Sequence, residues 1–224
     1  MRHSIVLGAS LWLVASVAWA QFEGVAGTLH NLSAQGPGEI RALTETEVCK
    51  FCHVPHSAEE PVPLWGHALS QAQYEVPQMR SGRGFSEPAP QPDGSSRLCL
   101  SCHDGTVALG DIAGEARPIQ MVGGERLGPS RPGHLGTDLS GSHPVSFVVG
   151  ELDMDTLDRE SDIGLRPLGA IRSDAHVKLD AEGKMQCTTC HDPHSDRYYQ
   201  PGRVPHFWVK ATVSEVCLTC HVAR

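Results

Sequence analysis

Aromatic side chains are scarce in this chain of 224 residues, because only 5% of them are Phe, Trp or Tyr. Basic residues are also fewer than acidic ones, 18 against 26, and the formal net charge is −8. Nucleic acids and anionic membranes attract basic surfaces, so we expect neither as a partner. Glycine (23) and proline (16) are plentiful, and both interrupt regular elements. The composition therefore predicts a mostly irregular chain whose interior is not filled by side chains alone.

Long hydrophobic runs are absent except at the N-terminus. Residues 5–17 are almost wholly apolar, and Ala18-Trp19-Ala20 after them is a small-x-small cleavage site. This pattern predicts a secretory signal peptide over residues 1–20, since the run is too short to span a membrane. We expect an exported protein without a membrane span, located outside the cell or at its surface, with the periplasm as second choice.

All eight cysteines fall in pairs separated by two residues, and a histidine directly follows each pair. The four sites, motifs 1 to 4 in chain order, are Cys49-Lys50-Phe51-Cys52-His53, Cys99-Leu100-Ser101-Cys102-His103, Cys187-Thr188-Thr189-Cys190-His191 and Cys217-Leu218-Thr219-Cys220-His221. This spacing is the attachment signal of c-type haem, in which both thiols bond the porphyrin and the histidine is the proximal iron ligand. Positions i and i+3 share one face of a helical turn, which suits two thiols on one porphyrin. We predict four covalently attached c-type haems.

Zinc sites and disulfides are the alternative interpretations of paired cysteines. Zinc is often bound by two Cys-x-x-Cys pairs, and an exported chain could oxidise its thiols. Neither alternative explains why a histidine follows every pair, so haem attachment is the favoured interpretation.

Residues just before the motifs carry helix-start signals. Thr46, Ser96 and Ser214 each precede the first cysteine of a motif by three residues, where a hydroxyl can cap a helical turn. Thr44 and Glu47 offer a capping box as an alternative for motif 1. Motif 3 lacks such a residue.

One repeated phrase divides the chain into two halves. His53-Val54-Pro55-His56-Ser57 matches His191-Asp192-Pro193-His194-Ser195, so motifs 1 and 3 carry an extra histidine that motifs 2 and 4 lack. The chain therefore resolves into two haem-pair halves, residues 21–110 and 142–224, joined by a segment rich in glycine and proline, 111–141.

We expect residues 21–224 to form a single tetrahaem domain. It should be mostly coil, with single-turn helices at the motifs and few short strands, wrapped around a stacked chain of haems. Residues 145–149 and 207–213 are the runs that favour strands.

Each iron needs a second axial ligand, and histidine is the expected one. His56 and His194 are the first candidates. Each starts on the same side of a porphyrin as its own motif histidine, so it must bind a different iron and bring two porphyrins together. Pro55 and Pro193 favour this arrangement, because proline ends a helix and extends the chain.

His30 and His143 are the next candidates as distal ligands, and His67 is held in reserve. His134, His176 and His206 are expected to be exposed or to pack against other side chains. Methionine is the alternative ligand type, because His/Met pairs also bind haem iron. The available methionines are Met79, Met121, Met154 and Met185. From the residues alone, the assignment of distal ligands to irons stays open.

Several longer phrases add to the haem motifs. They are His30-Asn31-Leu32-Ser33, Cys52-His53-Val54-Pro55-His56, Pro63-Leu64-Trp65, Cys102-His103-Asp104-Gly105-Thr106, Leu135-Gly136-Thr137-Asp138-Leu139-Ser140, His143-Pro144-Val145-Ser146-Phe147 and Cys190-His191-Asp192-Pro193-His194. With them the chain resembles the doubled-CXXCH family of multihaem cytochromes, and especially the tetrahaem outer-surface cytochromes that form extracellular filaments. The resemblance implies stacked haems, distal ligands His30, His56, His143 and His194, and an axial histidine donated by a neighbouring subunit in filament members.

Electron transfer is the function that these features favour, because six-coordinate irons leave no position for a substrate. We expect a subunit of an extracellular filament, with copies of itself, other redox proteins and extracellular electron acceptors as partners. A discrete periplasmic or cell-surface electron carrier is the alternative. A multihaem redox enzyme is the least favoured class, because the sequence has no Cys-x-x-Cys-Lys variant and has a surplus of histidine.

Overall fold

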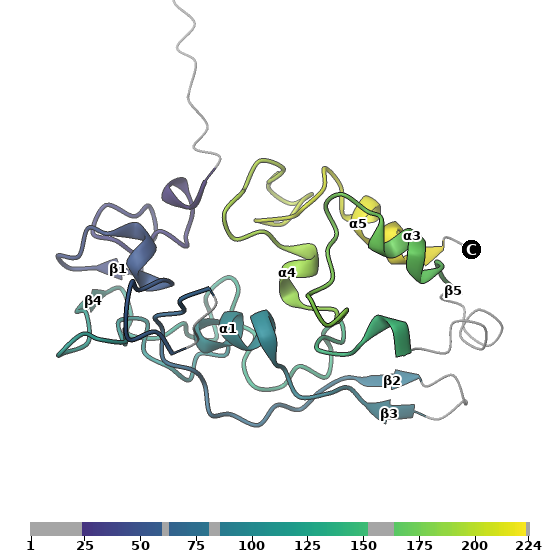
Figure 1. The fold of residues 1–224 in the computed structure, drawn as a ribbon. Helices are drawn as coiled ribbons and strands as arrows, with labels where there is room; N and C mark the ends of the chain where they lie inside the picture. The colour runs from purple at the N-terminus through teal and green to yellow at the C-terminus, as the bar shows by residue number, and fades with distance from the viewer. Residues whose placement is uncertain (1–23, 60–62, 81–85, 152–163, 223–224) are drawn as a thin grey trace, which may run out of the picture.

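Short elements joined by long loops make up the fold (Figure 1). The structure is a computed structural model that describes residues 24–59, 63–80, 86–151 and 164–222. The expected signal peptide, residues 1–20, lies outside the described residues. The expectation of a mostly irregular chain with few short helices and strands is confirmed.

Helical segments in the described ranges run from a single turn to ten residues, and none is long and apolar enough to cross a membrane. Four of them carry or precede the haem motifs. The helical segments are η1 (Val25–Gly27), η2 (Val48–Phe51), α1 (Gly94–His103), η3 (Val149–Glu151), α3 (Leu168–Arg172), α4 (Cys187–Cys190) and α5 (Val213–Cys220).

In the ranges that the structure describes, strands occur as three separate antiparallel pairs, with two or three residues per strand. The pairs are β1 (Arg41–Ala42) with β4 (Met121–Val122), β2 (Gln78–Arg80) with β3 (Ser86–Pro88), and β5 (Gly164–Leu165) with β6 (His221–Val222). The first pair fastens the segment 111–141 to the N-terminal part of the chain.

The two predicted strands are wrong. Residues 145–149 and 207–213 form no ladder, and each contributes only a single bridge, Val148 with Lys184 and Trp208 with His191. Their β-branched and aromatic residues pack instead into the interior, where Val149 is 3% exposed and Phe207 is 8% exposed. Tertiary packing thus overrides the local preference for a strand.

The interior consists of three small apolar clusters rather than one large core, and each includes a residue of a haem motif or its helix. The clusters are Val149, Ile171, Val177, Met185, Val216 and Cys220; Ala42, Phe51, Val54 and Ile112; and Tyr74, Leu100 and Leu139. Each cluster therefore packs around one part of the haem motifs among the described residues.

The helices begin at residues other than those predicted. For α5, Thr212 and Glu215 form a capping box, in which Thr212 Oγ1 accepts a bond from the Glu215 amide at 3.2 Å, and the predicted cap Ser214 lies inside the helix. For α1, the N-cap is Asp93, and Ser96 Oγ donates to the Gln186 side chain instead. The Thr46 and Thr44 predictions are also wrong.

Before motif 1, η2 has no side-chain cap, and the carboxylate of Glu45 instead binds the backbone that leads into it. Its Oε1 atom accepts bonds from the amides of Thr46 at 2.7 Å and Glu47 at 2.9 Å. Lys50 Nζ lies 2.8 Å from the same carboxylate and 2.7 Å from Glu115. An acidic side chain near the start of a turn is favourable because the amides there point outward and carry partial positive charge.

Candidate haem sites

In motifs 1 and 2, the histidine ring is hydrogen-bonded to a backbone carbonyl group of a loop outside the motif. In motif 1, η2 holds the cysteines, and His53 Nδ1 lies 2.8 Å from the Pro63 carbonyl oxygen. In motif 2, α1 holds them, and His103 Nδ1 lies 2.7 Å from the Gly133 carbonyl oxygen. Gly133 has a φ of +81°, a backbone conformation that side-chain-bearing residues rarely adopt. Each ring is therefore fixed in orientation by a loop outside its own motif.

Motifs 3 and 4 are built on α4 and α5. His191 Nδ1 lies 3.1 Å from the His206 carbonyl oxygen, and its ring meets Trp208 edge-on with centroids 4.9 Å apart. In motif 4, the Nδ1 atom of His221 is buried and has no hydrogen-bond partner. The backbone of Gly164 is the nearby group that favours a proton on this ring.

The supporting carbonyls fix the tautomer of three motif histidines. A carbonyl oxygen only accepts hydrogen bonds, so Nδ1 of His53, His103 and His191 must carry the proton. Nε2 then holds the free lone pair that binds a metal, and the Nδ1 bond orients the ring and raises its basicity. The donor set of these motifs therefore fits a haem iron.

Three motif histidines each face a second imidazole. The ring centroids are 6.0 Å apart for His53 and His194, 5.7 Å apart for His30 and His103, and 6.2 Å apart for His143 and His221. Two metal–nitrogen bonds of about 2 Å, plus the distance from each nitrogen to its ring centre, separate two axial imidazoles by about 6 Å. The spacing of all three pairs therefore suits one iron between two rings.

A narrow apolar pocket lies beside motif 3. Its walls include Leu100, Leu139, Pro90 and Pro92, and Cys187 and His143 also line it. Cofactor sites are lined mainly by apolar side chains with a few polar groups that fix orientation. The pocket has a volume of only about 60 Å³, too small for a porphyrin, and it brings a thiol of motif 3 near an imidazole that faces motif 4.

Thiols of successive motifs lie near one another. Cys52 lies close enough to Cys102 for their charges to interact, Cys99 hydrogen-bonds Cys187, and Cys190 has a similar charge interaction with Cys220. All eight cysteines are free thiols. No group of three or more His, Cys, Asp or Glu side chains in the described residues is gathered to hold a bare metal ion. The attachment sites therefore follow one another in space in the order of the chain.

Apart from Cys187, whose pKa is lowered to about 7 by a hydrogen bond with Cys99, burial keeps the shifted thiols and His30 uncharged. It raises the pKa of the Cys52 thiol to about 11 and that of Cys102 to about 12, so both are protonated at neutral pH. Burial, helped by the neighbouring imidazole of His103, lowers the pKa of His30 to about 4. His30 also stacks on Phe207 with centroids 4.4 Å apart. A neutral imidazole is the form that ligates a metal, so the environment of His30 suits a ligand.

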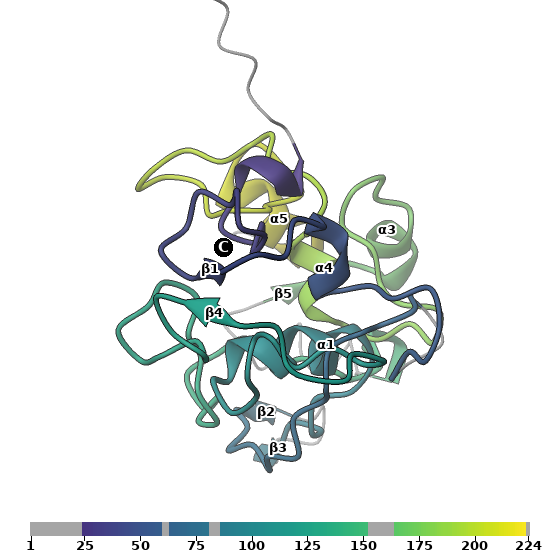
Figure 2. The same ribbon diagram turned by 90° about the vertical axis from the view of Figure 1, so that its left-hand side faces the viewer.

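A polar junction that no sequence pattern predicts joins α1 and α4, which lie side by side in both ribbon views (Figures 1 and 2). Gln186 is 2% exposed, and its Oε1 atom accepts bonds from the amide of Ser96 at 3.2 Å and its hydroxyl at 2.6 Å. Its amide group donates to Asp93 at 3.1 Å and to Asp180 at 2.9 Å. This one side chain joins motif 2 to motif 3.

A comparison with known families adds to this geometry. Residues 180–224 match the family model of the doubled CXXCH motif. No curated protein matches the chain. The matched segment contains motifs 3 and 4, and it supports the interpretation of the chain as a multihaem c-type cytochrome with covalently bound haem and a role in electron transfer.

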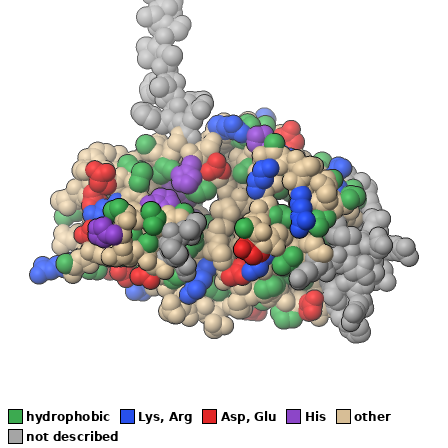
Figure 3. Space-filling view, in the orientation of Figure 1, with side chains coloured by type: hydrophobic (Ala, Val, Ile, Leu, Met, Phe, Trp, Pro, Cys, Tyr) green, Lys and Arg blue, Asp and Glu red, His purple; other side chains and the backbone are tan. Residues whose placement is uncertain are grey.

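The doubled-CXXCH segment also contains His194, which is exposed and faces His53 of motif 1. Its counterpart in the repeat, His56, is exposed too, and within the described part of the chain its hydrogen-bond contact is Ser57 Oγ at 3.4 Å from Nδ1. Imidazoles reach the surface in Figure 3. His67, the reserve candidate, is by contrast fully buried. The repeat therefore does not place its two extra histidines alike.

The remaining candidates have other surroundings. Met185 is 6% exposed within an apolar cluster, Met79 lies on β2 and Met121 on β4, whereas Met154 lies outside the described residues. His206 Nδ1 lies 2.7 Å from Asp196 Oδ2, and its ring stacks on Tyr199. His176 is exposed and His134 is half-buried. These histidines match the expectation of exposed or packed side chains.

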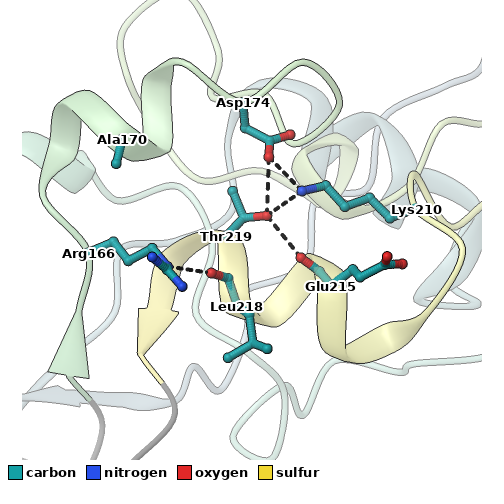
Figure 4. Close-up of a pocket in the computed structure, with 7 residues that line it drawn as sticks. All are labelled: Arg166, Ala170, Asp174, Lys210, Glu215, Leu218 and Thr219. Carbon is teal, nitrogen blue, oxygen red and sulfur yellow. Dashed lines mark hydrogen bonds and ion pairs between the residues drawn. The ribbon is translucent and has the colours of Figure 1, made fainter.

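An open pocket of about 390 Å³ lies between α3 and α5 (Figure 4). Lys210 Nζ donates to Asp174 Oδ2 at 2.5 Å and to Thr219 Oγ1 at 2.7 Å, and Arg166 Nε donates to the Leu218 carbonyl at 2.7 Å. The charged side chains that line the pocket are thus hydrogen-bonded to one another or to the backbone. The pocket therefore serves to fasten α5 to α3 rather than to hold a haem.

Proposed function

We propose that this protein is a tetrahaem electron-transfer protein in which each motif holds one haem between two imidazoles. The observation that carries this proposal is the set of three ring pairs, because each joins a motif histidine to a histidine outside the motifs at 5.7–6.2 Å. His30, His143 and His194 are the distal ligands of these pairs.

The residues of the chain have distinct tasks in this proposal. The cysteines hold the porphyrins covalently, and the motif histidines supply Nε2 to the iron. The carbonyl oxygens of Pro63, Gly133 and His206 hold the rings in the metal-binding tautomer. Bound haem supplies an iron that changes its oxidation state by one electron. Two imidazoles per iron leave no open position, which favours electron exchange over substrate chemistry and low potentials over high ones.

The order of the sites along the chain defines a path. Because thiols of motifs 1 and 2, 2 and 3, and 3 and 4 lie near one another, electrons would pass through the four haems in chain order. Gln186 and Ser96 hold the central step, from motif 2 to motif 3, in a fixed arrangement.

We extend the proposal to assembly and location. The expected signal peptide and the resemblance to outer-surface cytochromes support an exported subunit of an extracellular filament, made of copies of this chain and passing electrons to extracellular acceptors. Electron microscopy of secreted holoprotein tests this step. Filaments with a regular repeat are expected, and monodisperse monomers at high concentration would favour a discrete carrier at the cell surface or in the periplasm.

The electron-transfer proposal is tested on the holoprotein produced in a host that attaches c-type haem. Mass spectrometry should find four haems per chain, and electron paramagnetic resonance should find only low-spin iron. Cyanide should leave the spectrum of the oxidised protein unchanged. Fewer than four haems, or a high-spin iron that binds cyanide, would contradict the proposal, and the second result would favour a redox enzyme.

A further inference from the structure

The thiols of Cys99 and Cys187 meet at the junction between α1 and α4. Cys99 lies within α1, Cys187 is the first residue of α4, and the two helices are side by side (Figures 1 and 2). The Cys99 thiol hydrogen-bonds the Cys187 sulfur, whereas a charge interaction links it to Cys102, its partner in motif 2. Cys99 therefore has a more direct sulfur contact in motif 3 than within its own motif.

Polar bonds across the junction hold the two cysteines in this position. The amide of Cys187 donates to Ser96 Oγ at 3.0 Å, and the hydroxyls of Ser95 and Thr188 lie 2.6 Å apart. Ser96 Oγ in turn donates to Gln186 Oε1 at 2.6 Å. These bonds join residues of the chain itself, so they hold the two thiols together before any haem is attached.

The two thiols differ in acidity. The hydrogen bond from Cys99 lowers the pKa of Cys187 to about 7, against the opposite effect of burial. The same bond, together with burial, raises the pKa of Cys99 well above its usual value. The thiolate is the form of cysteine that attacks a disulfide. At neutral pH, a partly ionised and partly exposed Cys187 therefore lies beside a protonated Cys99.

Other neighbouring thiols of successive motifs have a different environment. Burial raises the pKa of Cys52 to about 11 and the pKa values of Cys102 and Cys190 to about 12, so these thiols are protonated at neutral pH. Their contacts with thiols of the next motif are charge interactions. Among the described pairs between motifs, the pair of Cys99 and Cys187 thus combines a thiol–thiol hydrogen bond with a thiolate.

We propose that, in the chain before haem attachment, Cys99 and Cys187 form a disulfide that joins motif 2 to motif 3. The oxidant is a small disulfide, RSSR. The Cys187 thiolate attacks one sulfur of RSSR, which forms a mixed disulfide and releases RS⁻. Cys99 then loses its proton and attacks the Cys187 sulfur, which releases the second RS⁻. Two cysteine thiols are oxidised, one RSSR is reduced to two RSH, and the two protons come from the cysteines.

The disulfide itself does not depend on the proposed function, but its consequence does. Each haem of motifs 2 and 3 is attached through both sulfurs of its motif. One disulfide between Cys99 and Cys187 therefore blocks both central haems until a dithiol reductant opens it. Motifs 1 and 4 keep both of their thiols and are not blocked by this bond.

The test uses the full-length chain produced in a host that does not attach c-type haem. The reduced chain is incubated with excess oxidised glutathione near neutral pH, alkylated, digested without reduction and mapped by mass spectrometry. We expect Cys187 to be the first thiol that carries glutathione, and the disulfide between Cys99 and Cys187 to be the predominant link between motifs. Disulfides confined to single motifs, or links spread evenly over all four motifs as in an unfolded chain, would overturn the proposal.

Two variants that each remove one thiol of motif 2 form a matched pair. Cys102→Ala removes the competing thiol within the motif and should keep the link between Cys99 and Cys187. Cys99→Ala should lose the link between motifs 2 and 3 and leave Cys187 bound to glutathione. The opposite result for either variant also overturns the proposal. Fewer than four haems in the holoprotein would instead refute the proposed function, and this outcome is independent of the disulfide in the haem-free chain.

Discussion

Motifs 1 and 3 differ from motifs 2 and 4 in the helices that carry them. Motifs 1 and 3 lie on single turns, η2 and α4, whereas α1 has ten residues and α5 has eight. The difference arises before the cysteines. In motif 3, the amide of Met185 donates to the Phe147 carbonyl at 3.0 Å, so the preceding backbone is bonded elsewhere and cannot extend the helix.

Motifs 2 and 4 therefore contribute to the structure differently from motifs 1 and 3. The longer helices carry much of the packing, because α1 buries Ser96, Leu100 and Ser101 and α5 buries Val216, Thr219 and Cys220. The single turns each bury one residue, and a proline two residues after the motif histidine leads the chain to a further histidine. We expect changes in motifs 2 and 4 to affect stability more, and changes in motifs 1 and 3 to affect iron ligation more.

Removing a haem attachment site should have the largest effect. Replacing both cysteines of motif 2, Cys99→Ala with Cys102→Ala, should remove one haem and lower the free energy of unfolding by more than about 4 kcal/mol. The matched change in motif 1, Cys49→Ala with Cys52→Ala, should also remove one haem but destabilise less, because η2 packs fewer residues. Mass spectrometry and guanidinium unfolding measure both. If both double variants were destabilised equally, the proposed difference in packing between motif 2 and motif 1 would be wrong.

The junction between α1 and α4 should give the next largest effect. Gln186→Ala removes the acceptor of two bonds from Ser96 and leaves buried polar groups unpaired, which should cost about 2–4 kcal/mol. Gln73→Ala, at an exposed position, is the control and should change the free energy of unfolding by less than about 0.5 kcal/mol. Equal stability of the two variants would contradict a stabilising role for the junction between α1 and α4.

The bond that fastens α3 to α5 should give a smaller, pH-dependent effect. Burial raises the pKa of Asp174, but hydrogen bonds from Lys210 and from two backbone amides outweigh it and hold the pKa well below the ordinary value of 3.8. The carboxylate therefore contributes stability above about pH 4 that is lost as the pH falls through the folded-state pKa. Asp174→Asn should cost about 1.5–3 kcal/mol at pH 7.

The pH dependence of the Asp174→Asn variant distinguishes an effect of charge from an effect of shape. The difference in free energy of unfolding between the parent and Asp174→Asn should be constant from pH 7 to pH 5 and shrink below pH 4, as measured by chemical unfolding. Glu125→Gln, at an exposed position, is the control and should give no such trend. A difference that does not depend on pH would show that Asp174 acts through shape rather than charge.

Helix capping should give the smallest effect and distinguishes two candidate caps of α5. Thr212→Ala removes an acceptor for the Glu215 amide and should cost about 1 kcal/mol. Ser214→Ala, at the position that the sequence favours, should be close to neutral because Ser214 lies inside the helix. Thermal unfolding of the two variants measures this, and a larger loss for Ser214→Ala would contradict the capping box.

Some features of the site could be predicted from the sequence and others could not. The mostly irregular fold follows from abundant glycine and proline and scarce aromatic residues. The positions of His30, His143 and His194 as candidates agree with the ring pairs. The cap residues and the two strands were mispredicted, because Ser96 bonds a glutamine far along the chain and Phe207 packs inward. No local pattern marks Gln186 as the link between two motifs.

The number of Cys-x-x-Cys-His motifs and the chemistry that they predict can be read from the sequence alone, because each motif consists of five consecutive residues. Which imidazole faces which motif was decided only by the tertiary structure. His53 meets His194 from the other half of the chain, whereas His56, the counterpart of His194 in the repeat, is exposed and lies beside Ser57. Such pairings depend on the paths of long loops, and those paths are set by carbonyl contacts and buried polar bonds between residues far apart in sequence.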